Sequence, residues 1–347
     1  MKNNFRKNGN MRVRFETPEE RREIIRILEE QRGFRIDGKL KRKEGISPRD
    51  NRTFDLNLKF KTYEYGLQPF IGAAMMSSGV RFYSAQEFFR IAELGFRVVP
   101  RFPVFHVPHD GREFPPELTA TIRVPEDEFL RYHEKTRDTD IRRAVPETYR
   151  GGDMCEVFRV SRLLCDPERF IGPEEVMEKY GMGFCYEKAY DGTVFKNVTP
   201  EIRERTLRYY REHHARMDLI CGRHPRILLI DLHSYSDEIV PADFLRAGTR
   251  TSDLCVGTDG RYTPPELIET VKRRFSEAGF TIAVNYPYSG CYVPNAITSG
   301  SCETDLAGIM LEFHKRTYCD GKGRSVPEKL DVIRKIIRQV IVDCVEL

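Results

Sequence analysis

Two histidines lie where apolar segments of the chain end. His233 belongs to the sequence Ile-Asp-Leu-His-Ser at residues 230–234, and His109 follows another apolar run on a turn rich in proline and glycine. A third apolar run, residues 307–313, contains a single acid, Glu312. Imidazoles at strand ends can bind a divalent metal ion, and a nearby carboxylate can act as a general base. These residue types therefore predict metal-assisted hydrolysis.

Each histidine also has a simpler interpretation. The chain contains eight histidines, and a single one after a strand is more often a capping or packing residue than a ligand. Two at separate strand ends favour a metal site. His106 is a competing ligand to His109, although its place before the turn favours a residue on the strand side. Asp231 shares a strand face with His233, so we expect it to orient that ring without contacting the metal.

The expected cofactor is one divalent ion per chain. Zinc accepts imidazole and carboxylate ligands and leaves a coordination position open for water, so zinc is the expected metal.

A mostly parallel sheet would bring such strand ends together. The β-like runs are 96–107, 156–165, 226–232, 280–286 and 306–313, and the helical patterns are 201–221, 263–278 and 327–345. Nearly continuous apolar strands separated by helices predict an α/β fold, with a mostly parallel or mixed central sheet and helices on both faces. Ligands bind such sheets beyond the carboxyl ends of the strands. His109, His233 and Asn285 are expected there.

The N-terminal part of the chain differs from the rest in charge. Residues 1–62 contain 18 Lys and Arg against 10 Asp and Glu, although the whole chain carries a net charge of only +4. A capping box between Thr17 and Glu20 predicts the start of a helix. We therefore expect a basic extension with one helix over residues 1–70, followed by a hydrolase domain over 71–347.

The composition narrows the functional class. No run reaches the roughly 18 apolar residues of a membrane helix, and the polar start is no signal peptide, so a cytoplasmic location is expected. The nine cysteines form no C-x-x-C pair, which argues against a disulfide framework and a cysteine-rich zinc site. The basic extension has few aromatic residues and no DNA-binding pattern, so it is read as a solvated arm. No glycine-rich phosphate loop supports nucleotide binding.

Six short motifs follow one another along the later part of the chain. They are Pro-His-x-Gly at 108–111, Asp-Thr-Asp at 138–140, Ser-Arg-x-x-x-Asp at 161–166, Asp-x-His-Ser at 231–234, Asn-x-Pro-Tyr-x-Gly at 285–290, and Glu312 followed six residues later by Tyr318. Each is weak alone, but the ordered set resembles the N-formylglutamate amidohydrolase (deformylase) family. The resemblance implies a zinc-carboxypeptidase-like α/β fold.

The resemblance also implies roles for the matching residues. His109 and His233 become metal ligands, Asp140 becomes the carboxylate ligand, and Glu312 becomes the general base. Glu113 is the alternative carboxylate, because its spacing from His109 is closer to the His-x-x-Glu of the wider carboxypeptidase-like group. Asp140 also has a structural alternative as an acid at a helix N-terminus.

The same resemblance implies a substrate pocket. Arg162 and Arg169 match arginines of the family pattern, and Asn285 and His214 are further candidates for substrate binding. The helix that carries His214 lacks the Pro and Tyr of the family's Tyr-x-Pro-Tyr-His. The family's Asp-x-Asn-Arg becomes Asp-Pro-Glu-Arg at 166–169, where an acid replaces a neutral amide, so the pocket is expected to differ.

The function expected from these features is hydrolysis of the amide bond of a small N-acyl amino acid, similar to N-formylglutamate. A metal-activated water would attack, with Glu312 as base. The alternatives are a carboxypeptidase-like or cell-wall peptide amidase and a non-catalytic binding protein on the same fold. Retention of both histidines and Glu312 argues against the binding protein.

Overall fold

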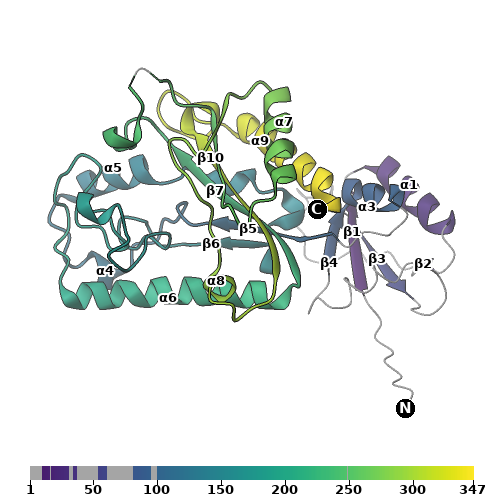
Figure 1. Ribbon diagram of the computed structural model, residues 1–347, viewed down its shortest axis with the longest axis horizontal. Helices are drawn as coiled ribbons and strands as arrows, with labels where there is room; N and C mark the ends of the chain where they lie inside the picture. The colour runs from purple at the N-terminus through teal and green to yellow at the C-terminus, as the bar shows by residue number, and fades with distance from the viewer. Residues whose placement is uncertain are drawn as a thin grey trace, which may run out of the picture.

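The computed structural model describes residues 10–15, 17–30, 34–36, 54–60, 81–94, 100–247 and 249–347. These residues form two sheets with their helices (Figure 1). The strands are β1 (Asn10–Phe15), β2 (Phe34–Ile36), β3 (Phe54–Phe60), β4 (Arg81–Ser84), β5 (Phe102–Val107), β6 (Cys155–Val157), β7 (Arg226–Tyr235), β8 (Leu254–Gly257), β9 (Ile282–Val284) and β10 (Asp305–His314). The α-helices are α1 (Pro18–Glu30), α3 (Ala85–Glu93), α4 (Pro116–Thr119), α5 (Glu126–Thr136), α6 (Pro200–Arg223), α7 (Pro265–Glu277), α8 (Asn295–Thr298) and α9 (Pro327–Asp343).

The larger sheet has six strands in the order β6-β5-β7-β10-β8-β9. Strands β6, β5, β7 and β10 are parallel, β8 runs antiparallel to β10, and β9 is parallel to β8. The expected mixed, mostly parallel sheet is therefore confirmed. Of the run expected at 156–165, only Glu156 and Val157 lie in a strand, β6, and β8 was not expected.

Burial on both faces explains why the central strands are nearly continuous apolar runs. Every residue of β5 is buried, as is every residue of β7 and β10 after the first. Helix α6 covers one face of this sheet, and α7 and α9 cover the other (Figure 1). Proline at the first helical position begins each of these three helices, where its missing N–H costs no helical hydrogen bond.

The smaller sheet has the order β2-β3-β1-β4 and packs with α1 and α3. The expected capping box is present, because Thr17 Oγ1 accepts from the Glu20 N–H and Glu20 Oε2 accepts from the Thr17 N–H, at 3.1 and 3.2 Å. Val13 and Phe15 of β1 and Ile24 of α1 are buried in one apolar cluster. This part of the basic segment is therefore a folded unit and not a solvated arm.

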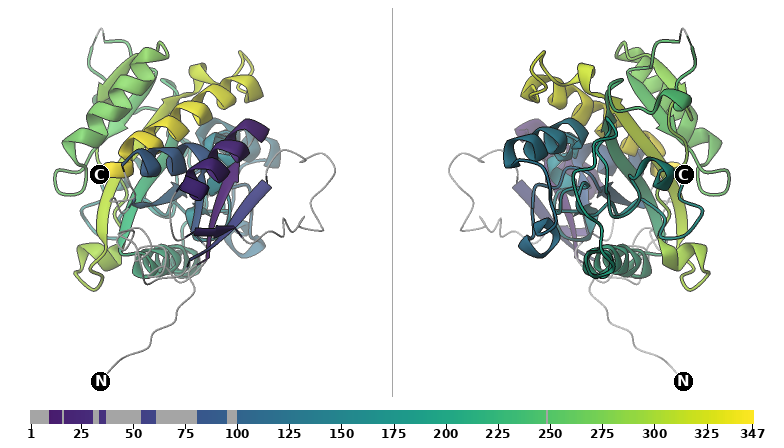
Figure 2. Two further views of the ribbon diagram at one scale, coloured as in Figure 1. Left: turned by 90° about the vertical axis from the view of Figure 1, so that its right-hand side faces the viewer. Right: turned by 90° about the vertical axis from the view of Figure 1, so that its left-hand side faces the viewer.

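The smaller sheet also extends past the boundary expected near residue 70. Strand β4 pairs with β1, and α3 continues directly from β4. Helix α3 lies beside α9 (Figure 2), and Arg90 of α3 forms an ion pair of 3.0 Å with Glu346. The expected boundary, the charged connector at 39–50 and the first residues of the run 96–107 lie outside the described residues.

Candidate metal centre and active site

Strands β5, β7 and β10 lie side by side and place four chemically active residues in two rows. The strand register pairs His106 with Asp231 and His233 with Glu312. Asp231 and His233 are two residues apart, so both rows lie on the same face of the sheet. All four side chains are buried. A single strand register therefore fixes the relative positions of two imidazoles and two carboxyl groups.

His109 and His233 face each other through the same ring atom. Their Nδ1 atoms are 3.2 Å apart. The other nitrogen of each ring, Nε2, lies close to a carboxylate. His109 Nε2 is 2.8 Å from Asp166, and His233 Nε2 is 3.1 Å from Asp231. Metal-bound histidines usually present one nitrogen to the ion while a carboxylate orients the other. For His109, Asp166 occupies the orienting position through a hydrogen bond, whereas Asp231 lies close to His233 Nε2 without an aligned hydrogen bond.

Asp138 completes a three-atom set with this pair. Its backbone N–H donates to the carbonyl of His109 at 2.9 Å, which fixes it against the turn after β5. Its Oδ2 atom lies 3.4 Å from His233 Nδ1 and 3.7 Å from His109 Nδ1. Within the described residues this buried oxygen accepts no aligned hydrogen bond. Ligands about 2.0–2.1 Å from a tetrahedral zinc lie about 3.3 Å apart, close to these separations.

Asp166 links His109 to two arginines. Its Oδ2 atom accepts from Arg162 Nη2 and from Tyr186 Oη, both at 2.9 Å, and lies 3.7 Å from Arg169 Nε. Burial alone would raise the pKa of Asp166, but His109, Arg162 and Arg169 hold it well below its ordinary value. Asp166 is therefore an anion that holds two guanidinium groups beside the histidine pair.

Glu312 has a raised pKa. Burial raises the pKa of its carboxyl group to about 8, and neighbouring Asp138 adds to the effect while His233 and Arg162 oppose it. For Asp138, burial also acts to raise the pKa, but His233, His109 and Arg162 hold it below its ordinary value. Two acids with opposite shifts suit different tasks, one as a ligand and one as a proton acceptor.

The comparisons with known proteins identify the family of the chain. Residues 103–319 match the family model described as N-formylglutamate amidohydrolase. The chain belongs to this family. Family membership confirms the resemblance seen in the sequence motifs and makes the chain a hydrolase of the amidohydrolase type with a small substrate.

One solved structure supports the fold. The crystal structure of N-formylglutamate amidohydrolase from Ralstonia eutropha JMP134 is 21% identical over 71% of this chain and 94% of that chain, with a TM-score of 0.55. A zinc-free YndL structure and a bacteriophage poly-gamma-glutamate hydrolase each cover 35% of this chain, and 56% and 55% of their own. Their identities are 17% and 14%, with TM-scores of 0.24 and 0.23. The search of curated proteins gave no match.

Other sets of ligand atoms border the histidine pair in this amidohydrolase. Within the described part of the chain, His109, Glu168 and His233 form one group with metal-binding spacing, and His106, Glu168 and Asp231 form another. The facing Nδ1 atoms and Asp138 Oδ2 form a further set, defined by the distances given above. Its imidazole and carboxylate donors suit zinc and related divalent ions.

The structure does not bring the two predicted carboxylate ligands to the histidines. Asp140 has a positive φ of 56°, and its carboxylate bonds to Arg112 and Ser325. Glu113 has a side chain that is 58% exposed and lies 3.9 Å from Arg159. Asp138, the first acid of the same Asp-Thr-Asp motif, lies at the pair instead. The Asp-Thr-Asp motif therefore brings one acid to the histidine pair, but the sequence alone did not show which of its two acids this is.

Of the four predicted substrate-binding residues, two are beside the centre. Arg162 and Arg169 lie next to it through Asp166. Asn285 is exposed and exchanges hydrogen bonds with Thr258, because β8 and β9 run opposite to β10 and their carboxyl ends point away from those of β7 and β10. His214 bonds to other residues: its ring nitrogens lie 3.0 Å from Tyr292 Oη and 2.9 Å from the carbonyl oxygen of Pro167.

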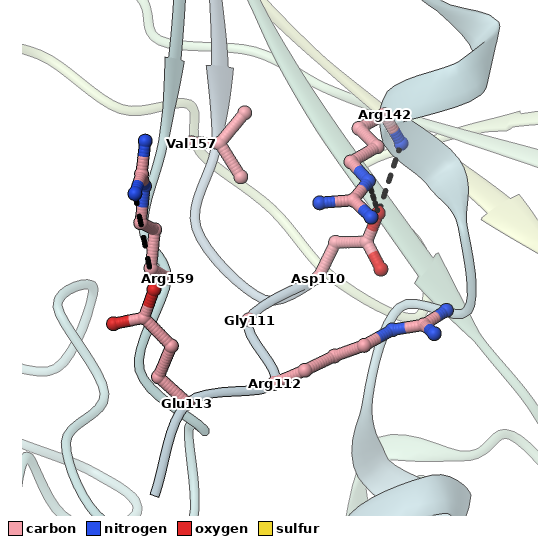
Figure 3. Close-up of a pocket in the computed structure, with 7 residues that line it drawn as sticks. All are labelled: Asp110, Gly111, Arg112, Glu113, Arg142, Val157 and Arg159. Atoms are coloured by element: carbon pink, nitrogen blue, oxygen red, sulfur yellow. Dashed lines mark hydrogen bonds and ion pairs between the residues drawn. The ribbon is translucent and has the colours of Figure 1, made fainter. Parts of the chain in front are cut away.

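A hollow opens on the other side of the turn after β5. It has a volume of about 370 Å³ and is lined by Asp110, Gly111, Arg112, Glu113, Arg142, Val157 and Arg159 (Figure 3). Asp110 and Arg142 form an ion pair of 3.5 Å across it. His109, His233, Asp138 and Glu312 are not among the lining residues, so this hollow is separate from the candidate centre.

No helix among the described residues is long and apolar enough to span a membrane.

Proposed function

We propose that this protein is a metal-dependent hydrolase that cleaves the amide bond of a small N-acyl amino acid. One observation carries the proposal: the facing Nδ1 atoms of His109 and His233, with the unpaired Oδ2 of Asp138, lie beside Glu312 on the neighbouring strand. Family membership supports the amidohydrolase class, and the geometry supports the metal and the base.

His109, His233 and Asp138 would hold one divalent ion, with zinc as the expected metal. The fit rests on the buried, unpaired Asp138 oxygen and on a donor set of two imidazoles and one carboxylate. When bound, such an ion polarises the amide carbonyl and lowers the pKa of a water towards roughly 7.

Glu312 would move the proton. It lies across from His233 in the strand register, so its carboxylate can accept a proton from the attacking water and donate it to the leaving nitrogen. A pKa of about 8 suits a group that must take up and release a proton near neutral pH. Arg162 supplies positive charge that favours the ionised form at the start of the reaction.

Arg162 and Arg169 would orient the substrate through its free carboxylate. Arg162 donates Nη2 to Asp166 at 2.9 Å, whereas its buried Nε donates to no acceptor in the described structure. The planar guanidinium group suits two parallel hydrogen bonds to a carboxylate. Because Asp166 also contacts His109, it would set the position of the substrate carboxylate relative to the reacting amide.

The experiment is a hydrolysis assay on N-acyl amino acids, including N-formylglutamate, beside their methyl esters and amides. The free acids should be cleaved about 10- to 150-fold faster in kcat/KM, since a charge-assisted contact contributes about 1.5–3 kcal/mol. Arg162→Ala should remove much of this preference without changing metal content. Equal rates for acids and esters in the native enzyme would contradict the carboxylate pocket and favour a peptide amidase.

A further inference from the structure

A second group of ligand atoms lies on the far side of the His233 ring from Asp138. His106 Nδ1 is 2.8 Å from Asp231 Oδ1 and 3.6 Å from Glu168 Oε1. The side chains of His106 and Asp231 are 0% and 2% exposed, whereas that of Glu168 is 15% exposed. The group is therefore buried but has one solvent-facing member. None of its three residues has a place in the proposed hydrolysis except Asp231, which orients His233.

His213 on α6 is placed to orient the ring of a metal-bound His106. The Nε2 atoms of His106 and His213 are 2.8 Å apart. His213 Nδ1 is buried and has no hydrogen-bond partner in the described part of the chain, but it lies 3.8 Å from Glu156 Oε1. Glu156 in turn bonds to Arg216 at 2.7 Å. With a cation on His106 Nδ1, its Nε2–H donates to His213, and the His213 Nδ1–H then faces Glu156.

Both carboxylates of the group still have lone pairs for a cation, although Asp231 Oδ2 accepts the Tyr292 N–H at 3.1 Å. His233 Nε2 lies 3.1 Å from both Asp231 Oδ1 and Glu168 Oε2, yet within the described residues it makes no aligned hydrogen bond to either. The Glu168 carboxylate reaches towards two histidines at once, with Oε2 at His233 and Oε1 at His106. Buried carboxylate oxygen atoms that accept no aligned hydrogen bond from His233 are suited to binding a cation.

We propose that His106 Nδ1, Asp231 and Glu168 form a second divalent-cation site, distinct from the one at His109, His233 and Asp138. One imidazole and two carboxylates suit Zn²⁺, Co²⁺ or Mn²⁺ better than Mg²⁺, which prefers oxygen ligands alone. The partly exposed Glu168 is the entry side of this site. The site does not depend on the identity of the substrate.

The test uses the full-length protein, freed of metal by a chelator and titrated with Co²⁺ by calorimetry, with elemental analysis after gel filtration. The native protein should bind about two ions per chain, and His106→Asn and Glu168→Gln should each bind about one. His213→Phe should weaken the second ion about 10- to 100-fold, since it removes the partner of a ligand. Glu174→Gln, an exposed acid in the same loop as Glu168, should leave both ions bound.

Two controls keep the test decisive. His106 is fully buried, so His106→Asn can fail to fold; Glu168→Gln keeps the side-chain shape at a partly exposed position and tests the same site. Binding of only one ion by the native protein, or of two ions by Glu168→Gln, would overturn the second site. Amidase activity with one bound ion would leave the proposed function intact, whereas two bound ions without activity would contradict that function alone.

Discussion

Asp138 and Asp140 show how two acids in one motif take different roles. The Asp138 N–H is tied to the His109 carbonyl at 2.9 Å, so this acid must follow the turn after β5. Asp140 adopts a left-handed backbone conformation, which directs its carboxylate to Arg112 and Ser325. A difference of two residues thus separates a candidate ligand from an acid that pairs with Arg112 and Ser325.

The ligand assignment predicts a ranking between these two acids. Asp138→Asn should weaken binding of the ion at the His109 and His233 pair far more than Asp140→Asn, because only an anionic oxygen at Asp138 offsets the charge of the ion. Metal affinity is measured by competition with a chelator of known strength. His109→Ala serves as the reference for a lost ligand, and the opposite ranking would exclude Asp138 as the carboxylate ligand.

Glu312 provides the second prediction for a single residue. Glu312→Gln should fold and bind metal but lose roughly 10²-fold or more in kcat, the usual scale of general acid–base catalysis. The glutamine keeps the shape of the side chain but cannot accept the proton. Turnover of a cleaved N-acyl amino acid and metal content are measured on the same preparation. An unchanged kcat with full metal content would make Glu312 a structural residue.

At the scale of the elements, the turn after β5 packs directly against residues 159–161. The N–H of Glu113 donates to the Arg159 carbonyl at 2.9 Å, and the N–H of Ser161 donates to the Glu113 carbonyl at 3.0 Å. A Cβ atom on Gly111 would lie 2.3 Å from the Val160 carbonyl oxygen and 2.5 Å from that of Arg159. Only glycine allows this approach, which brings His109 close to the segment that carries Arg162 and Asp166.

The close approach at Gly111 predicts that one added methyl group there destabilises the fold. Gly111→Ala should destabilise the fold by about 1–3 kcal/mol or more, because the clash is with backbone atoms that cannot rotate away. It should also weaken metal binding by moving His109 relative to Asp166. Gly222→Ala is the matched control: it lies in α6 with open space around it and should be neutral or stabilising by up to about 1 kcal/mol. Urea unfolding of both variants gives the comparison, and equal stabilities would contradict the packing argument.

On the scale of the whole molecule, buried histidines make stability depend on pH. His133 of α5 contacts Ser161 through Nδ1 at 2.9 Å. Burial lowers its pKa to about 4, with Glu134 opposing and Arg137 assisting the shift. The unfolded chain binds a proton near pH 6.5, whereas the folded protein resists it, so stability is complete above that pH and is lost as the pH falls towards 4.

A substitution at His133 should therefore flatten this pH dependence. Between pH 7 and pH 4.5 the unfolding free energy of the native protein should fall by about 1–3 kcal/mol more than that of His133→Gln. The reason is that glutamine cannot take up a proton in the unfolded state. The quantity compared is the change in unfolding free energy between the two pH values, so the constant cost of the substitution cancels. Identical pH dependence in the two proteins would show that His133 ionises equally when folded and unfolded.

The sequence by itself indicated the α/β class, the mostly parallel sheet and the amidohydrolase family, and it singled out His109, His233 and Glu312 as candidates for the site. These features depend on local information: apolar runs encode buried strands, and the motifs keep their order along the chain. Arg162, Arg169 and Asp231 were also candidates from short segments, and their roles stay predictions.

Only the tertiary structure decided which acids and histidines meet. The choice of Asp138 over Asp140 and Glu113 depends on one backbone dihedral and one hydrogen bond. The removal of Asn285 from the site depends on the direction of β8 relative to β10. The cluster of His106, Glu168 and Asp231 depends on strand register and on a loop that approaches from 57 or more residues away. Contacts of this kind join segments distant in the chain, so no local pattern encodes them.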